Sequence, residues 1–167
     1  MTGSSGSGKI GSTTFSNEDF TITSIADTAN IQTFAEGGST GYNVVDNSSS
    51  ITIDTVGTFQ FTSQSVTAVN NTSSEVIYSQ MNVALWETFG SSAYSSWNLG
   101  TSIGPIHTGG LLEQWGPPNP SVATTGGTLV FNAGDPSTTF TATIVPEPAA
   151  FVLLALASAG LLLGHRR

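Results

Sequence analysis

The side chains that could support catalysis in this sequence are few and scattered. His107 is the one histidine outside the last three residues, and no recognisable motif surrounds it. A serine or threonine nucleophile needs a base held beside it, and a glycosidase needs two carboxylates across a cleft. The acidic residues are dispersed along the chain, so no such pair is singled out. We therefore expect no catalytic residues and no enzyme activity.

Motifs for cofactors and metals are also missing from the sequence. It contains no aspartate-rich calcium loop, no glycine-rich phosphate loop and no pair of histidines at metal-binding spacing. It has no cysteine, which excludes disulfides, thiolate metal sites and cysteine nucleophiles. We expect neither a cofactor nor a metal ion.

The charge of the sequence excludes one large class of partner. Charged residues make up 8% of the chain, and the net charge is -8. Ten of the eleven acidic residues precede Pro146, and Lys9 is the only basic residue in that stretch. A surface of this sign repels phosphate backbones and offers no basic patch that could release counterions. We expect no nucleic-acid partner.

The C-terminal stretch combines three features in a fixed order. The motif Val145-Pro146-Glu147-Pro148 comes first, an uncharged apolar run follows over Ala149–Gly164, and Arg166 and Arg167 end the chain. The prolines disfavour helix and ladder pairing, so they separate the tail from what precedes it. Sixteen residues of helix reach about 24 Å, which is short of a hydrocarbon core of about 30 Å. We predict a marginal membrane helix with its arginines on the cytoplasmic side.

A buried C-terminal helix of a soluble protein is the alternative interpretation of this tail. A helix that packs on a domain this small should be amphipathic, whereas Ala149–Gly164 is apolar on every side and is followed by basic residues. The flanking residues therefore favour the membrane interpretation.

The combination of the Val-Pro-Glu-Pro motif, a short apolar helix and terminal arginines resembles the PEP-CTERM sorting signal of exosortase substrates. The resemblance covers Val145–Arg167 only. It implies export through the Sec translocon, temporary retention in the inner membrane, and processing near Pro146-Glu147-Pro148 by an exosortase. Glu147 and the two prolines would be recognition residues. The protein would then reach the cell surface or the extracellular matrix, commonly in bacteria that make exopolysaccharide.

Such proteins normally begin with a signal peptide, and residues 1–9 contain no apolar segment of that kind. A mis-called start, a fragment and a removed leader would each explain this difference. If the start is mis-called, we expect an in-frame signal peptide upstream of the Met1 codon.

The remaining residues predict an all-β fold. Residues 1–14 are rich in Gly, Ser and Thr and are interpreted as a flexible lead-in. Residues 15–145 are expected to form an antiparallel β-sandwich of Greek-key type, because short alternating runs are separated by frequent turns. The expected strands are Asp19–Ile25, Ile31–Phe34, Tyr42–Val45, Ser50–Gln64, Val66–Val69, Glu75–Trp86, Thr128–Asn132 and Thr138–Ile144.

The predicted core of this sandwich follows from period-two alternation. We expect Ile51, Ile53, Phe59 and Phe61 to share one face, and Ile77, Met81, Val83 and Leu85 to point inward in turn. Phe131 and Phe140 complete the predicted core. The third segment of the molecule, 146–167, is the sorting signal.

Regular patterning fails between Glu87 and Gly127, where we predict a long loop. Tyr94, Trp97 and Trp115 lie in it, and exposed aromatic rings can stack on sugar rings. Two interpretations stay open. The loop aromatics could form a carbohydrate-binding platform, or Trp97 and Trp115 could cap an open end of the sandwich, which we favour. The leading hypothesis for the whole chain is an exported, non-enzymatic surface or matrix protein, with a carbohydrate-binding module as the second.

Overall fold

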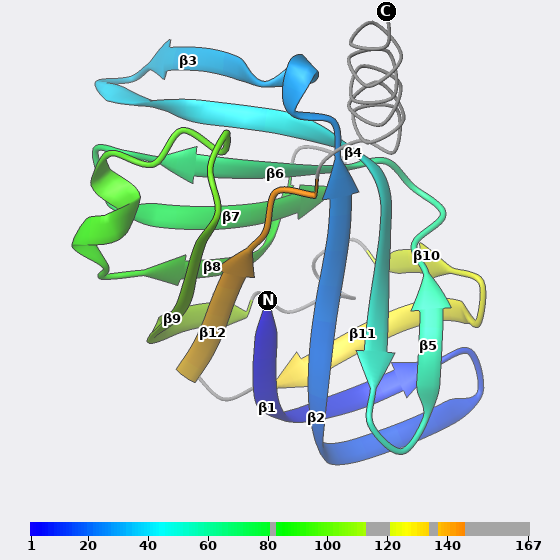
Figure 1. The fold of residues 1–167 in the computed structure, drawn as a ribbon. Coiled ribbons are helices and arrows are strands. Elements are labelled where there is room, and N and C mark those ends of the chain that lie inside the picture. The colour runs from blue at the N-terminus through cyan, green and yellow to red at the C-terminus, as the bar shows by residue number, and fades with distance from the viewer. Residues whose placement is uncertain (81–82, 113–120, 134–136, 146–167) are drawn as a thin grey trace, which may run out of the picture.

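The computed structural model describes residues 1–80, 83–112, 121–133 and 137–145. In that part of the chain, twelve strands and two short 3-10 helices form an all-β domain (Figure 1). Every strand pairing is antiparallel, which confirms the predicted class. The strands are β1 (Thr2–Ile10), β2 (Thr13–Ala26), β3 (Gln32–Glu36), β4 (Ser39–Ile53), β5 (Gly57–Gln60), β6 (Ser65–Asn70), β7 (Glu75–Gln80), β8 (Val83–Phe89), β9 (Ile103–Leu112), β10 (Val122–Thr124), β11 (Gly127–Ala133) and β12 (Ser137–Ala142), and the 3-10 helices are η1 (Thr28–Asn30) and η2 (Ser92–Ser95).

The strands form one continuous sheet that closes on itself, so the predicted sandwich of separate sheets is wrong. Within the described residues the ring runs β1, β12, β9, β8, β7, β6, β4, β2 and back to β1. The cause is the length of β2 and β4, which pass from one half of the molecule to the other. A strand that pairs with different neighbours along its length joins what would otherwise be two layers.

β4 shows this change of neighbours most clearly. Its first half pairs with β3 on one side and β6 on the other, and its second half pairs with β2 and β5. Asp27 lies between β2 and β3 and starts η1, because its Oδ1 accepts a 2.8 Å hydrogen bond from Ala29 N. The outer strands β10 and β11 extend the sheet beyond β1.

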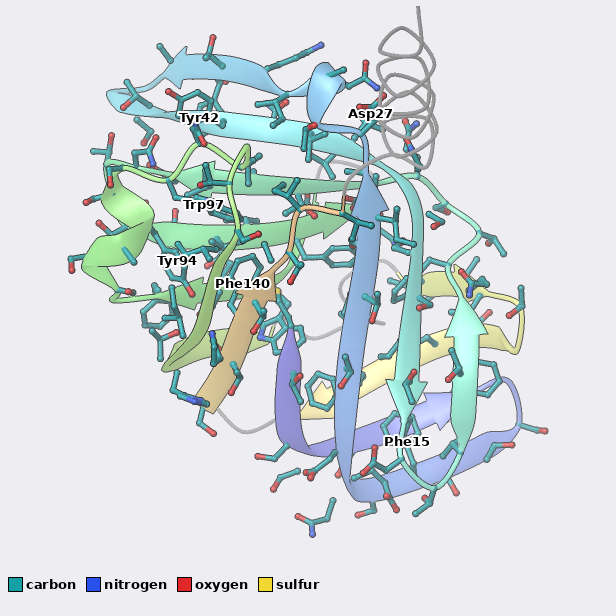
Figure 2. All side chains as sticks on the ribbon, viewed as in Figure 1. Phe15, Asp27, Tyr42, Tyr94, Trp97 and Phe140 are labelled. Carbon is teal, nitrogen blue, oxygen red and sulfur yellow. The ribbon has the colours of Figure 1, made fainter. Side chains whose placement is uncertain are left out.

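The core divides into two clusters of buried side chains. The larger cluster fills the half that β1, β2, β4, β5, β10 and β11 enclose, and the smaller one lies under η2 and the segment after it. Figure 2 shows Phe15 in the first half and Tyr94, Trp97 and Phe140 together in the second. The larger cluster contains Ile10, Phe15, Phe20, Ile22, Ile51, Ile53, Phe61, Tyr78, Trp86, Val122, Leu129 and Phe131. The smaller contains Val44, Val69, Val76, Tyr94, Trp97, Leu99 and Phe140.

Much of the predicted core is confirmed. Ile51, Ile53 and Phe61 are buried, as are Phe131 and Phe140, and Phe59 is partly buried against the same cluster. The run predicted as one strand over Ser50–Gln64 is instead the end of β4 and the short β5, joined by a turn at which Gly57 has a φ of +126°.

The predicted strand over Glu75–Trp86 also consists of two strands. β7 ends at Gln80, and β8 begins at Val83 and runs back beside it. Val76 and Tyr78 point into the core and Ile77 is only partly buried, so the predicted inward set is wrong by one residue at this point. Met81 and the side chains of Val83 and Leu85 lie outside the described residues. The β6–β7 hairpin itself is confirmed: Asn70 Oδ1 accepts from Thr72 N at 3.1 Å in its turn.

The prediction of a flexible lead-in over residues 1–14 is wrong. Thr2–Ile10 is strand β1, which pairs with β2, β11 and β12. Its glycines are a packing requirement. A Cβ on Gly6 would lie 2.6 Å from Phe131 Cζ, and a Cβ on Gly8 would meet the carbonyl oxygen of Val130. The glycines that made this segment look like a linker therefore allow core rings and a neighbouring backbone to approach β1 closely.

The predicted loop over 87–127 contains more regular structure than its sequence indicates. It holds η2, β9 and β10, and β9 pairs with both β8 and β12. β9 contains Gly104, Pro105, Gly109 and Gly110, and these residues hide the alternation of a strand. None of the helices in the described part of the chain is long and apolar enough to cross a membrane.

Candidate functional site

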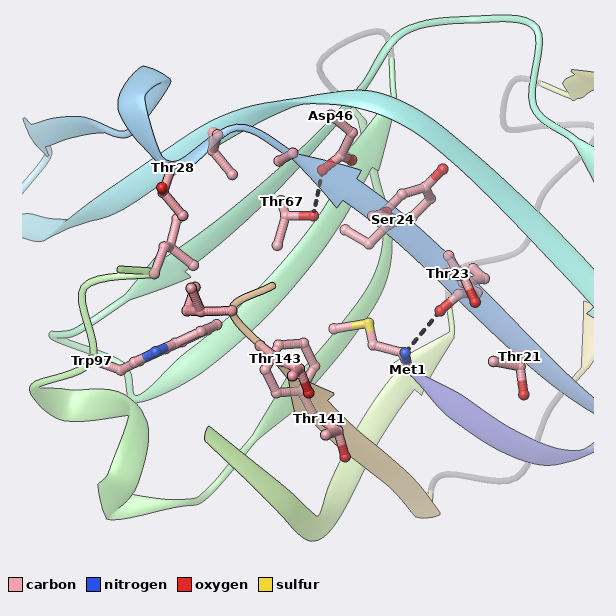
Figure 3. A pocket seen from close by; sticks show the side chains of 18 of the residues that line it. Met1, Thr21, Thr23, Ser24, Thr28, Asp46, Thr67, Trp97, Thr141 and Thr143 are labelled. Carbon is pink, nitrogen blue, oxygen red and sulfur yellow. Dashed lines mark hydrogen bonds between the residues drawn. The ribbon is translucent and has the colours of Figure 1, made fainter. Parts of the chain in front are cut away.

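A pocket of about 370 Å³ opens in the wall of the domain between β2 and β12 (Figure 3). Its size falls in the range of small-ligand sites. β2, β4 and β12 supply about half of its lining, and Met1, Thr67, Tyr78, Trp97 and Leu99 are among the other lining residues. Many of the lining side chains are threonines, which carry a methyl and a hydroxyl group each.

Alternation along β2 and β12 decides which of the lining side chains are buried. Ile22 and Phe140 are buried, whereas Thr23 and Thr141, which also line the pocket, are exposed. Two residues further along each strand the side chains are small: Ser24 follows Ile22 on β2, and Ala142 follows Phe140 on β12. Because these small residues follow large ones on both strands, the wall is hollowed at this point.

The one acidic residue among the pocket-lining residues is Asp46, which is 6% exposed. Its Oδ2 accepts a 2.7 Å hydrogen bond from Ser65 Oγ, and its Oδ1 accepts a 3.0 Å hydrogen bond from Thr67 Oγ1. A buried carboxylate is costly unless such donors surround it. β6 supplies both donors because it pairs with β4 directly beside Asp46.

A chain of hydrogen bonds leads from Asp46 into the core. Ser65 Oγ lies 2.9 Å from Ser49 Oγ, which lies 3.0 Å from the Tyr78 hydroxyl. Ser65 Oγ is placed to donate its one proton either to the carboxylate of Asp46 or to Ser49 Oγ. Gln80 Nε2 completes the series by donating to the Tyr78 hydroxyl at 2.8 Å.

Burial dominates the electrostatics of this network. It raises the pKa of Asp46 above the ordinary 3.8, although the hydroxyl groups of Ser65 and Thr67 partly offset the effect. Burial also raises the pKa of Tyr78, so this phenol stays protonated and available as a donor.

Ser24 Oγ is buried on the pocket wall. It has no hydrogen-bond partner of ordinary geometry in the described part of the chain, although the hydroxyl lies close enough to Asp46 to favour the carboxylate. An unpaired buried hydroxyl costs free energy that a bound group could recover.

The amino group of Met1 lies at one end of the pocket. It donates a 2.8 Å hydrogen bond to the carbonyl oxygen of Ile22. Burial lowers its pKa from 8.0 to about 6. The pocket is therefore a poor environment for charge of either sign.

The arrangement lacks the parts of a hydrolytic site within the described residues. Asp46 has no second carboxylate across the pocket, and no histidine lines it. His107 lies exposed on β9, where its Nδ1 is 2.8 Å from Thr139 Oγ1. The residues that the structure describes include no group of three His, Cys, Asp or Glu that could hold a metal ion.

Two of the three aromatic residues proposed as a sugar platform, Tyr94 and Trp97, are buried. Tyr94 is 0% exposed and Trp97 is 6% exposed, and both rings pack on Phe140 with centroids 5.9 and 5.4 Å away. Trp97 Nε1 donates to Thr101 O at 2.8 Å. Trp97 belongs to the smaller core cluster and also borders the pocket. Trp115 lies outside the described residues.

Of the predicted sorting motif, the described residues include only the first, Val145. Val145 is 79% exposed, beyond the end of β12. Pro146, Glu147, Pro148, Arg166 and Arg167, together with the predicted helix over 149–164, lie outside the described residues.

Sequence reasoning missed the pocket, and among its lining residues only Trp97 is a predicted candidate site residue. Asp46 follows Val44 and Val45, and this pattern carries no signal that distinguishes a buried acid from a surface one. Comparison with protein-family models, curated proteins and solved structures finds no match to this chain.

Proposed function

We propose that the chain is an exported, non-enzymatic surface or matrix protein whose tail, Val145–Arg167, is a sorting signal of the PEP-CTERM type. The observation that carries the proposal is the junction between domain and tail. β12 ends at Ala142, and Ile144 and Val145 are 38% and 79% exposed. The motif thus begins directly after the last strand, on backbone that the closed sheet does not use.

The chemistry of the motif explains how this junction would be processed. Pro146 and Pro148 cannot donate to a ladder, and each restricts the residue before it to extended conformations. An extended, unpaired segment can enter the active site of a membrane enzyme without local unfolding of the domain. Glu147 supplies a charge between the prolines that such an enzyme can recognise.

The domain suits an extracellular role in which binding or assembly matters more than catalysis. Its surface is poor in charge, its network around Asp46 is structural, and it is closed without disulfides. The membrane helix is short, which favours temporary retention over permanent anchoring. Exosortase, the Sec translocon and exopolysaccharide are the partners that this function entails.

The experiment compares the full chain with the variant Pro146→Ala/Pro148→Ala in a bacterium that has an exosortase. A signal peptide is fused in frame so that export does not limit the outcome. We expect the wild-type chain in the surface or medium fraction and the variant as an unprocessed precursor in the membrane fraction. The control is the wild-type chain in a strain without exosortase, where the precursor should also accumulate. Equal release of both chains in both strains would contradict the proposal.

A further inference from the structure

Four large apolar residues are exposed at the end of the domain from which the tail departs. They are Ile25 near the end of β2, Val45 on β4, and Ile144 and Val145 after β12, and they are 61%, 41%, 38% and 79% exposed. We call these four residues the exit patch. In the described part of the chain, Phe89 is the only other large apolar residue that is exposed to this extent. Apolar residues that gather at one end of a domain, rather than singly, indicate an interaction site.

Strand pairing brings the members of the exit patch together. Ala26 on β2 is paired with Asp46 on β4, and neither of these side chains is exposed. Ile25 and Val45 precede them in the chain and are exposed, so they lie diagonally across the strand pair, at about 7–8 Å. Ile144 borders the same pocket as Ala26. Figure 1 shows the end of β2 and the segment after β12 at the same end of the domain.

The carboxylates of the β2–β4 pair are concentrated at its opposite end. Glu18 and Asp19 lie there with Asp54, whose N–H donates to Asp19 O at 3.0 Å. Six residues of strand separate Asp19 from Ile25, which corresponds to about 20 Å. Asp27, the acidic residue beside the exit patch, is half-buried and caps η1 with its carboxylate. The far carboxylates would therefore stay in water if the exit patch met an apolar phase.

The tail keeps the exit patch close to a bilayer whenever the predicted membrane helix is inserted. Pro146, Glu147 and Pro148 separate Val145 from the start of that helix at Ala149. Four residue steps of extended chain span at most about 14 Å. The headgroup layer on each side of a bilayer takes up about 5–8 Å of that distance. Val145 is therefore held at the headgroups or directly above them.

We propose that the exit patch docks on the lipid surface while the tail is inserted, so that the domain sits on the membrane in one orientation during sorting. This inference rests on the proposed sorting function. Docking withdraws the apolar side chains from water and holds the Val-Pro-Glu-Pro motif at the surface where a membrane enzyme acts. An uncharged bilayer surface suits the patch best, because the chain carries a net charge of -8 and is repelled by anionic lipids.

The experiment places single cysteines in the full chain, which has no native cysteine. Ile25→Cys, Val45→Cys and Phe89→Cys each carry a polarity-sensitive fluorophore, and the protein is reconstituted in phosphatidylcholine vesicles that contain lipids with spin-labelled headgroups. Phe89 is the matched control, since it is 42% exposed and pairs with Gly109. Gly109 in turn pairs with the first residue of β12, at the end remote from the tail. Labelled Leu156→Cys, with spin labels on the acyl chains, reports whether the tail is inserted.

We expect blue-shifted emission from the labels at Ile25→Cys and Val45→Cys. Quenching there should be about twofold or more greater than at Phe89→Cys, because a docked side chain lies within about 5–10 Å of the boundary between headgroups and acyl chains. Quenching of Leu156→Cys combined with equally weak quenching at the other three positions would overturn the docking and leave the sorting function intact.

Two further outcomes would contradict the proposal in different ways. Absence of quenching at Leu156→Cys would show that the tail is not inserted, which would overturn the membrane helix and the docking together. A blue shift at Ile25→Cys and Val45→Cys that comes without quenching and grows with the protein-to-lipid ratio would assign the exit patch to a second copy of the chain.

Discussion

Ser65 Oγ lies 2.7 Å from Oδ2 of Asp46 and donates a hydrogen bond to this buried carboxylate. The contact joins β6 to β4 across the wall of the pocket and anchors the series that continues through Ser49 to Tyr78. The network holds an ionised or ionisable group in a part of the molecule with little access to water. Its stability is therefore sensitive to pH.

We expect Asp46→Asn to remove a pH-dependent term from the stability of the fold. The pKa of Asp46 is raised by burial, so its contribution is fully present below the ordinary pKa of 3.8 and is lost as pH rises through the folded pKa. The free energy of unfolding of the wild-type chain should thus fall with rising pH relative to that of Asp46→Asn. Each unit of raised pKa corresponds to about 1.4 kcal/mol.

Urea unfolding from below pH 3.8 to neutral pH measures this difference. The control is Asp54→Asn, which removes the same charge from an exposed turn residue. Parallel curves for wild-type and Asp46→Asn across the whole range would show that the carboxyl group of Asp46 is not destabilised by burial.

The second prediction concerns β1. Gly8→Ala should destabilise the fold by about 1–3 kcal/mol or more, because the added Cβ meets the backbone oxygen of Val130, which cannot rotate away. Gly100→Ala is the matched control, since its Cβ would lie 3.3 Å from a flexible side-chain atom of Asn98. Thermal unfolding of the two variants compares them. Equal midpoints would mean that residues 1–10 are not held in the sheet.

The third prediction separates packing from sugar binding at Trp97. Trp97→Ala should cost about 3–5 kcal/mol, because the ring is buried against Phe140. Any loss of retention on immobilised exopolysaccharide should then follow the fraction of unfolded protein. Trp97→Phe keeps most of the apolar volume and is expected to retain the fold. Loss of polysaccharide binding in a fully folded Trp97→Phe variant would assign the indole a direct role in sugar recognition.

Sequence patterning succeeded where side chains alternate within one strand. Ile51 and Ile53 on β4, and Phe61 directly after β5, are buried as expected, and Phe59 on β5 is partly buried, because large apolar residues recur at period two. It failed at Val76 and Tyr78, because the alternation was extended across a chain reversal between β7 and β8.

Patterning could not find β1 or the pocket for a different physical reason. Gly3, Gly6 and Gly8 are buried without side chains, so hydrophobic periodicity carries no trace of them. Asp46 and Ser24 line the pocket because β2 pairs with β4, and this depends on pairings between distant segments. The tail motif, in contrast, can be identified from a few consecutive residues without knowledge of the fold, but the described residues include only Val145 of it.

Intact-mass analysis of the mature protein from an exosortase-containing host tests the central claim most directly. If Val145–Arg167 is a sorting signal, processing near Pro146-Glu147-Pro148 should leave a mature protein that lacks Ala149–Arg167. The same analysis of the Pro146→Ala/Pro148→Ala variant should find the full tail, because helix can then extend upstream through the motif. Mature wild-type protein that still ends at Arg167 would contradict the account and would make the tail a simple membrane anchor.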